Sequence, residues 1–200
     1  MESVDLLDAV DGNECLMPAT SRVPSGAWGC LQSHLRILRR ALVEGYDRLG
    51  GAVVVLEDDA IFAEDFRDRS LDLLARTPAG WDMVYLGGQH THGRERHPRR
   101  VAEGIVQAYS VNRTQAYVIR GAAISIAYRH LDDLGLIADA PHRHVDHRLE
   151  ELHRSGRLAV YAPERWLVGQ AAGLSDINPI GAWRRRMDAE RWWHPDVVLD

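Results

Sequence analysis

Lysine is absent from this chain, and cysteine is nearly absent. All 24 lysine-or-arginine positions are arginine, and the only cysteines are Cys15 and Cys30. The missing lysine excludes chemistry that depends on a Schiff-base lysine, such as lysine-dependent aldol or pyridoxal reactions. The two cysteines have neither the spacing of a metal-binding pair nor the number that a disulfide framework needs.

Long apolar runs are also missing. No run approaches the length that spans a bilayer, and the N-terminus lacks the apolar core of a signal peptide. We therefore expect a cytoplasmic protein. A net charge of -5 argues against general nucleic-acid binding, which needs a basic face. With 46% hydrophobic and 26% charged residues, residues 1–200 are predicted to form one globular α/β domain.

The most informative stretch is residues 50–62, where an apolar run leads into three acids, Glu57, Asp58 and Asp59. A glycine pair followed by β-branched residues is typical of a strand buried on both faces. Adjacent carboxylates at the end of such a strand repel each other, and a hard divalent cation such as Mg²⁺ or Mn²⁺ relieves the repulsion. The alternative is that Asp58 or Asp59 only caps a helix that begins near Ala63.

An amphipathic helix is predicted just upstream of this strand. Leucines recur there at three- and four-residue steps, at Leu31, Leu35, Leu38 and Leu42. Gly29, placed at the start of this helix, lets a backbone or a phosphate approach closely, and a helix N-terminus favours an anion. Ser33 and His34 fall in its first turns, where the alternative is a helix cap and an internally bonded histidine.

Strands and helices alternate along the rest of the chain. The patterns predict strands at 4–10, 81–86, 105–111, 116–120 and 158–161, and helices at 64–76, 121–131 and 145–155. Such alternation predicts a single three-layer α/β/α structure.

The order of the motifs resembles glycosyltransferase family 25, the lipopolysaccharide-type galactosyltransferases and their collagen-modifying relatives. The resemblance rests on a glycine-cysteine-serine-histidine motif, a helix, an apolar strand, the three acids and an aromatic helix start. The matching residues are Gly26, Gly29, Cys30, Ser33, His34, Glu57, Asp58, Asp59 and Phe66. Weaker matches follow at 81–88, Val145-Asp146, Gln170 and 175–177, so that the resemblance covers most of residues 4–178.

The resemblance implies a GT-A type fold and a glycosyltransferase. Such an enzyme moves a hexose, with galactose the first expectation, from a UDP-sugar to a glycan or lipid-linked acceptor. The implied setting is bacterial cell-surface polysaccharide or lipopolysaccharide synthesis, and the reaction is expected to be inverting and assisted by Mn²⁺ or Mg²⁺.

The resemblance also assigns roles to residues. Asp59 is the expected direct metal ligand, and Glu57 and Asp58 bind either the metal or the donor. Gly29, Ser33, His34 and Gln170 are expected to bind the donor, with Ser175 and Asp176 also lining the pocket. Asp146 is the candidate general base for the acceptor hydroxyl. The alternative for Asp146 is a first-turn aspartate that the helix dipole favours.

Two departures from the family pattern affect this expectation. Ala27 stands where relatives commonly have an acidic residue. Relatives also begin with a strand and an arginine-containing loop that help hold the nucleotide. This sequence starts almost directly at Val4, so that strand is missing from it. Either the chain is a truncated form of a longer protein, or its donor pocket is incomplete.

The C-terminal residues 180–200 are rich in tryptophan and arginine, including Trp183, Arg184–Arg186 and Trp192-Trp193. Aromatic residues beside arginines suit the interface of a membrane, and peripheral membrane contact is one expectation for this tail. The alternative is a helix that packs its tryptophans on the domain.

Two other functions fit parts of the sequence. Four histidines, at positions 142, 144, 147 and 153, suggest a metal-dependent hydrolase, although their spacing matches no metal-ligand signature. A non-catalytic glycosyltransferase-like binding protein with an incomplete donor pocket is the second alternative.

Overall fold

The computed structural model describes residues 4–91, 97–140 and 143–171. Helices and strands both occur, but the regular alternation predicted from the sequence is not observed, because four strands follow one another between residues 83 and 120 and three helices follow between residues 122 and 154. In chain order they are α1 (Ser25–Val43), β1 (Ala52–Leu56), β2 (Ala60–Phe62), α2 (Phe66–Arg76), β3 (Met83–His90), β4 (Arg99–Ala102), β5 (Ile105–Gln107), β6 (Val111–Arg120), α3 (Ala122–Leu131), α4 (Leu134–Asp139), α5 (Val145–Arg154), β7 (Val160–Pro163) and β8 (Val168–Gln170).

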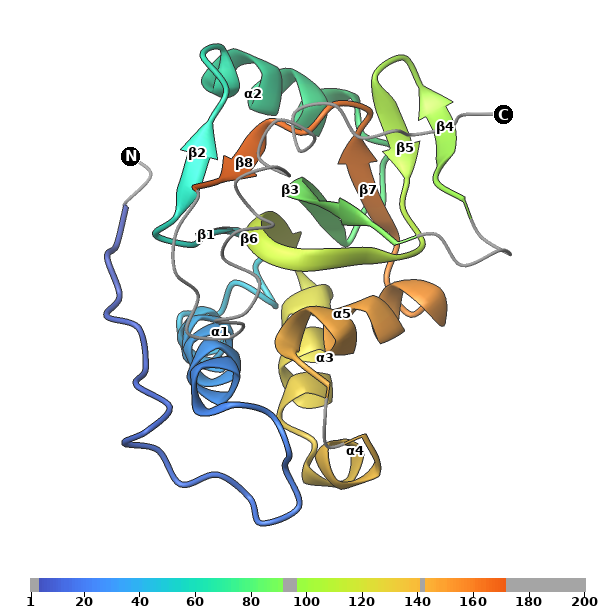
Figure 1. The fold of residues 1–200 in the computed structure, drawn as a ribbon. Coiled ribbons are helices and arrows are strands. Elements are labelled where there is room, and N and C mark those ends of the chain that lie inside the picture. Colours follow the sequence, from blue (N-terminus) through green and yellow to red (C-terminus); the bar gives the residue numbers. More distant parts are fainter. Residues whose placement is uncertain (1–3, 92–96, 141–142, 172–200) are drawn as a thin grey trace.

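Six of the strands form one mixed sheet in the order β1-β6-β3-β7-β5-β4 (Figure 1). Only β3 and β7 pair in parallel, and the other neighbouring strands are antiparallel. Strands β2 and β8 pair separately as a small antiparallel ribbon. The α/β class is confirmed, and the architecture is compatible with an α/β glycosyltransferase-like fold.

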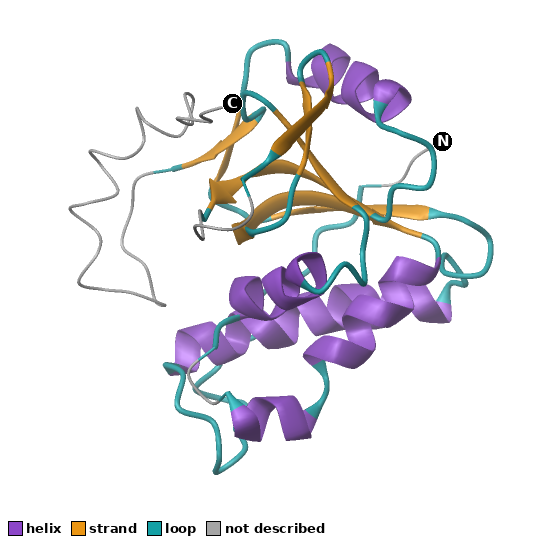
Figure 2. Ribbon diagram, turned by 90° about the vertical axis from the view of Figure 1, so that its right-hand side faces the viewer, coloured by secondary structure: helices purple, strands orange, loops and turns teal. Residues whose placement is uncertain are grey.

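Helices cover the two faces of the large sheet unequally. Figure 2 shows a group of helices on one face and a single helix, α2, on the other. The central strand β3 serves both faces, because Met83 and Tyr85 join the core under α1, α3 and α5, whereas Val84 and Leu86 join the core under α2 and β8. This alternation is the two-residue period of a strand. The described chain is thus layered α/β/α, as predicted.

Helix α1 carries the predicted apolar stripe. Its buried side chains recur at helical spacing and include Leu31, Leu35 and Leu38. His34 lies on the same stripe and is only 2% exposed. The helix begins at Ser25, so Gly29 lies inside it rather than at its start. The prediction that Gly29 stands at the helix start is therefore wrong.

Strand β1 is an edge strand, and the prediction that it is buried on both faces is wrong. It pairs with β6 alone, with no described strand on its outer side. Val55 faces the core and is 3% exposed, whereas Val54 is 53% exposed and Leu56 is 44% exposed. The apolar run of β1 therefore has one face in the core and one face exposed to solvent.

Other predicted boundaries shift. Residues 4–10 form no strand, and Val4 and Leu6 are at least 90% exposed because this segment has no sheet partner. The predicted strands at 105–111 and 116–120 become the short β5 and the long β6. The sequence patterns missed β2, β4, β8 and α4, which have only three to six residues each. Such short elements depend on their partners rather than on local periodicity.

Candidate functional site

The three predicted acids directly follow β1, but their side chains go to different surroundings. Asp58 is exposed, whereas Glu57 and Asp59 are half-buried. Glu57 turns toward α1 and β6, and Asp59 turns toward β8. The predicted position of the three acids at the end of this strand is therefore confirmed. In the folded chain Glu57 and Asp59 contact different elements.

Glu57 belongs to a hydrogen-bonded cluster with His34, Thr114 and Tyr117. Its Oε1 accepts a hydrogen bond from the Thr114 hydroxyl at 2.6 Å and lies 3.3 Å from Nε2 of His34. The other ring nitrogen of His34, Nδ1, lies 2.9 Å from the Tyr117 hydroxyl. Helix α1 positions the histidine, while β6 positions the threonine and the tyrosine. The cluster fixes the direction of the Glu57 carboxylate.

The charges in this cluster reinforce each other. Burial by itself lowers the pKa of His34, but its interactions with Tyr117, Cys30 and Glu57 outweigh burial and raise this pKa well above its ordinary value. Burial by itself raises the pKa of Glu57, and the bonds to His34 and Thr114 together with the charge of Arg113 bring it below its ordinary value. Glu57 is therefore held as a carboxylate paired with His34.

A second line of contacts joins Asp59, Gln170 and Arg113. The side-chain amide of Gln170, at the end of β8, donates to Oδ2 of Asp59 at 2.6 Å. Its carbonyl oxygen accepts from Nη1 of Arg113 at 3.0 Å. The Arg113 Nε also donates to Gln89 Oε1 at 3.3 Å. Gln170, predicted to bind the donor, thus lies beside the predicted metal ligand Asp59.

Asp146 also contacts Arg113, through the backbone rather than the side chain of the arginine. It lies in the first turn of α5, and its Oδ2 accepts from the backbone N–H of Arg113 at 3.1 Å. Its Oδ1 accepts from the backbone N–H of His147 at 2.8 Å. The bond to His147 lies within the first turn of α5 and fits the capping alternative, whereas the bond to Arg113 joins α5 to β6. Each carboxylate oxygen keeps a further lone pair, and the side chain is 20% exposed, so the geometry also admits a substrate proton.

The donor set fits a hard cation at Asp58 and Asp59. Both offer carboxylate oxygens in the turn after β1, and Asp58 is exposed to incoming ligands. Hard oxygen ligands are those that Mg²⁺ and Mn²⁺ prefer. Glu57 is already bound to His34 and Thr114, so it contributes less readily to such a site. The metal site itself stays a prediction.

Within the described residues, only Cys30, His34 and Glu57 bring three possible metal-ligand atoms within 4.8 Å of one another. A thiol and an imidazole suit a transition metal rather than Mg²⁺ or Mn²⁺. Both ring nitrogens of His34 already have partners, which explains the cluster without a metal. Of the four candidate hydrolase histidines, 144, 147 and 153 do not form such a group, and His142 lies outside the described residues.

Gly29 and Ser33 contact the chain's own N-terminal segment. A Cβ at Gly29 would lie 2.3 Å from the Val10 carbonyl oxygen and 2.8 Å from the Gly12 nitrogen. The Ser33 hydroxyl accepts from the Val10 N–H at 2.9 Å and donates to the Gly29 carbonyl at 2.9 Å. The close approach predicted at Gly29 is therefore an approach of this segment, and donor binding by either residue stays a prediction.

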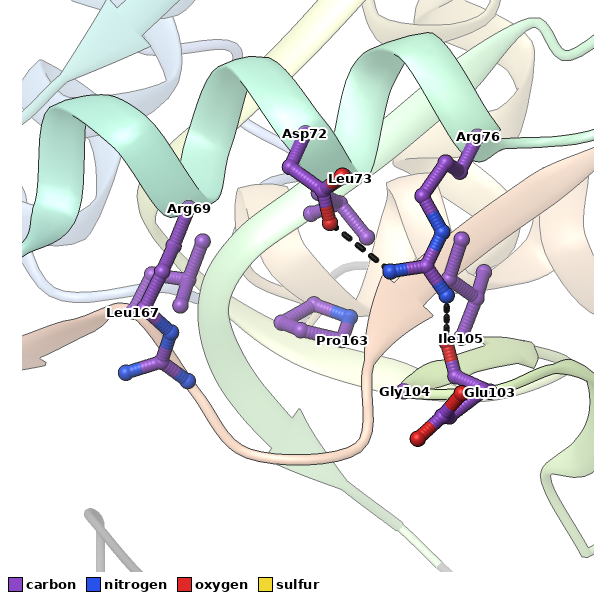
Figure 3. Close-up of a pocket in the computed structure, with 9 residues that line it drawn as sticks. All are labelled: Arg69, Asp72, Leu73, Arg76, Glu103, Gly104, Ile105, Pro163 and Leu167. Atoms are coloured by element: carbon purple, nitrogen blue, oxygen red, sulfur yellow. Dashed lines mark hydrogen bonds and ion pairs between the residues drawn. The ribbon is translucent and has the colours of Figure 1, made fainter.

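A cavity of about 170 Å³ lies elsewhere, between α2, the β4–β5 turn and the β7–β8 connection (Figure 3). Arg76 bonds to Asp72, one turn earlier on the same helix, and to the Glu103 carbonyl oxygen in the β4–β5 turn (Figure 3). The cavity shares no residue with the candidate site, and its two lining arginines bond to neighbouring aspartates and backbone. It contributes nothing to the chemistry considered below.

Sequence reasoning missed Arg113, Thr114 and Tyr117. The polar run 112–115 interrupts an otherwise apolar strand, and this interruption was the one available signal. Ser175, Asp176 and the tail 180–200 lie outside the described residues. None of the described helices is both long and apolar enough to cross a bilayer.

The fold and these groups define a mixed α/β protein with carboxylates at a strand end, held by polar side chains from α1, β6 and β8. Asp146 of α5 joins this group through the backbone of Arg113. Sequence comparison adds a family relationship. The chain is 31% identical over 97 residues to the Rattus norvegicus protein named "Probable inactive glycosyltransferase 25 family member 3", covering 47% of this chain and 16% of that protein. For "Inactive glycosyltransferase 25 family member 3" the identity is 28% over 137 residues in Mus musculus, covering 58% of this chain and 22% of that protein. For the Homo sapiens protein of the same name the identity is 32% over 98 residues, covering 48% of this chain and 16% of that protein.

These matches support a relationship to the glycosyltransferase 25 family. They span 16% to 22% of the length of the relatives, all three of which are mammalian proteins named as inactive. They do not support the narrower assignment to the lipopolysaccharide-type galactosyltransferases. No family model matches the chain.

Proposed function

We propose that this protein is a glycosyltransferase that moves a hexose from a nucleoside-diphosphate sugar to a glycan hydroxyl. One observation carries the proposal: Asp59, Gln170 and Asp146, predicted as site residues from three separate segments, belong to one line of hydrogen bonds. Gln170 bonds to Asp59, and Arg113 bonds to both Gln170 and Asp146. Galactose, a UDP donor and a cell-surface polysaccharide or lipopolysaccharide acceptor are the finer parts of the proposal, and they rest on the family resemblance.

In this reaction the acceptor oxygen forms a bond to the anomeric carbon of the donor sugar. The bond from that carbon to the diphosphate oxygen breaks, and the diphosphate leaves with the electron pair. Asp146 takes the proton of the acceptor hydroxyl, which makes the oxygen a better nucleophile. A single displacement of this kind inverts the anomeric configuration.

Asp58 and Asp59 would hold Mn²⁺ or Mg²⁺, and a bound divalent ion supplies positive charge beside the departing diphosphate. Gln170 orients the Asp59 carboxylate through its amide N–H. His34 and Thr114 orient Glu57, which is then available to donor hydroxyl groups on its exposed side.

Calorimetry with UDP tests the proposal. We expect UDP to bind only in the presence of Mn²⁺ or Mg²⁺, and we expect Asp59→Ala to lose most of this affinity because it removes a charged oxygen ligand. Asp68→Ala is the matched control, since it removes an exposed aspartate on α2 with the same change in charge. Equal UDP affinity with and without metal would contradict the proposal.

The role of Asp146 has its own test. Asp146→Asn keeps the size of the side chain but removes its basicity, and we expect it to reduce sugar transfer by roughly 10²–10⁴-fold while UDP binding persists. UDP release from UDP-galactose, measured with polysaccharide acceptors, reports this rate. Near-native turnover in the variant would return Asp146 to the capping role.

The second candidate is a non-catalytic member of the family that binds a sugar nucleotide or a glycan. The names of the mammalian relatives, which describe them as inactive, favour it. Binding of UDP and metal without any turnover of UDP-sugars, over a range of acceptors, would select this candidate.

A further inference from the structure

Arg113 has an unusual backbone conformation. Its φ is +74°, and it is the only non-glycine residue with a positive φ in the described part of the chain. A side chain in this region is strained, and such residues persist only where their surroundings hold them. Arginine has no local side-chain bond of the kind that lets asparagine adopt this conformation. The contacts of Arg113 therefore have to account for its geometry.

The strain lies in a β-bulge next to the acidic turn. Between β3 and β6 the register runs from Gly87 opposite Ala116 to Gln89 opposite Asn112. One residue of β3 thus faces three residues of β6, residues 113–115. Bulges of this kind turn side chains out of the regular alternation and are frequent beside active sites. Here the bulge turns the Thr114 hydroxyl to Glu57 and the Arg113 guanidinium to Gln170.

Arg113 contacts the candidate site through two independent groups. Its backbone N–H holds Asp146, a contact that any residue in the same conformation retains. Its guanidinium holds the carbonyl oxygen of Gln170, whose amide is thereby directed at Asp59. Gln89 accepts from the Nε of the same guanidinium and limits its rotation. The charge of the guanidinium also acts on Glu57 and helps to lower the pKa of this carboxylate.

We propose that Arg113 is a positioning residue that presets Asp59 for the metal and nucleotide through Gln170, and Asp146 through its strained backbone. The inference rests on the proposed function and deepens it. Side chains that orient a metal ligand from outside typically change metal affinity by about 10- to 100-fold when removed. Strain retained for positioning also predicts that relieving it leaves stability unharmed while weakening binding.

The test uses Arg113→Gly in the full chain. Glycine adopts a positive φ without strain, so the backbone contact to Asp146 is kept while the guanidinium is lost. We expect a melting temperature within about 3 °C of the native value, since relief of strain offsets the added flexibility of the unfolded chain. Titration with Mn²⁺ alone, followed by electron paramagnetic resonance, and calorimetry with UDP and Mn²⁺ should both show roughly 10-fold weaker binding.

A double-mutant cycle with Gln170→Ala tests whether Arg113 acts on Asp59 through Gln170 or affects metal binding directly. If Arg113 acts through Gln170, Arg113→Gly should change Mn²⁺ affinity less than about 3-fold in the Gln170→Ala background. If the fold-losses in Mn²⁺ affinity of the two single variants multiply fully in the double variant, Arg113 does not act through Gln170. Arg129→Ala is the control, because this exposed arginine bonds only to Ser125 of its own helix in the contacts seen. Arg113→Asn, which also tolerates a positive φ, replaces the glycine variant should that variant fold poorly.

The outcomes distinguish this inference from the function on which it rests. Failure of the native chain to bind UDP with metal overturns both. Native binding that is unchanged in Arg113→Gly overturns the inference alone. A melting temperature lowered by more than about 8 °C together with unchanged affinity of the folded fraction would make Arg113 a purely structural residue.

Discussion

At the scale of single residues, burial sets the behaviour of His153. This residue of α5 is 2% exposed, and its ring lies edge-on to Tyr85 with 5.3 Å between the ring centroids. Its Nε2 lies 3.5 Å from the Tyr85 hydroxyl, and its Nδ1 has no hydrogen-bond partner among the described residues. Burial lowers the pKa of His153 from 6.5 to about 3. The ring is therefore neutral in the folded protein at ordinary pH.

This shift predicts acid sensitivity with a definite sign. Between pH 6.5 and about 3 the unfolded chain binds a proton at His153 that the folded chain does not, so the free energy of unfolding falls as the pH falls. The loss is at most about 5 kcal/mol, since each pH unit contributes about 1.4 kcal/mol. His153→Gln, which stays neutral, should flatten this part of the pH dependence in urea unfolding.

His97→Gln is the control for this prediction, because it makes the same substitution at an exposed histidine. Parallel curves for the native chain and His153→Gln between pH 7 and pH 4 would show that His153 does not carry the effect.

At the scale of elements, β1 shows how position in a sheet outweighs apolar composition. The strand lies at the edge of the sheet, where it pairs with β6 alone, and only one of its faces is buried. Val55 joins the core under α1 and α3, whereas Val54 points to solvent. Val54 and Val55 are therefore expected to contribute differently to the free energy of unfolding.

Two matched substitutions measure this difference. Val55→Thr buries a hydroxyl in the core, and we expect it to lower the free energy of unfolding by about 1–3 kcal/mol. Val54→Thr should change it by less than about 0.5 kcal/mol, as surface substitutions usually do. Chemical denaturation of the two variants compares them directly. Equal destabilisation would mean that the outer face of β1 is covered in solution.

At the scale of the whole molecule, two cores share the central strands. One core lies under α1, α3 and α5 and contains Leu149, and the other lies under α2 and contains Leu73. Strands β3 and β6 contribute alternate residues to both cores. Loss of one core therefore removes support from the strands that hold the other.

This sharing predicts a single cooperative unfolding transition. Leu149→Ala and Leu73→Ala should each lower the free energy of unfolding by about 2–5 kcal/mol, the usual range for a buried leucine, and each variant should keep one transition. Circular dichroism and tryptophan fluorescence, recorded on the same samples, should give coincident curves. Two separate transitions in Leu73→Ala would show that the core under α2 unfolds independently.

Features that depend on a local residue pattern could be predicted from the sequence alone. The leucine spacing of α1, the apolar run of β1 and the acids that follow it were predictable, because helix and strand periods repeat over a few residues. The long helices α2, α3 and α5 were predictable for the same reason, within a few residues at their ends. Asp59 could therefore be proposed from its place after an apolar run, whereas Asp146 was proposed from the family resemblance of the Val145-Asp146 segment.

Contacts between side chains from distant segments, in contrast, arise only in the folded chain. The partners of Glu57 are His34 on α1 and Thr114 on β6, 23 and 57 residues away in the chain, and no local pattern relates them. The edge position of β1 and the β2–β8 ribbon arise from pairing between distant segments, as the register of a sheet always does. The positive φ of Arg113 likewise comes from the bulge and from the contacts to Asp146 and Gln170, because nothing in an arginine side chain favours that conformation.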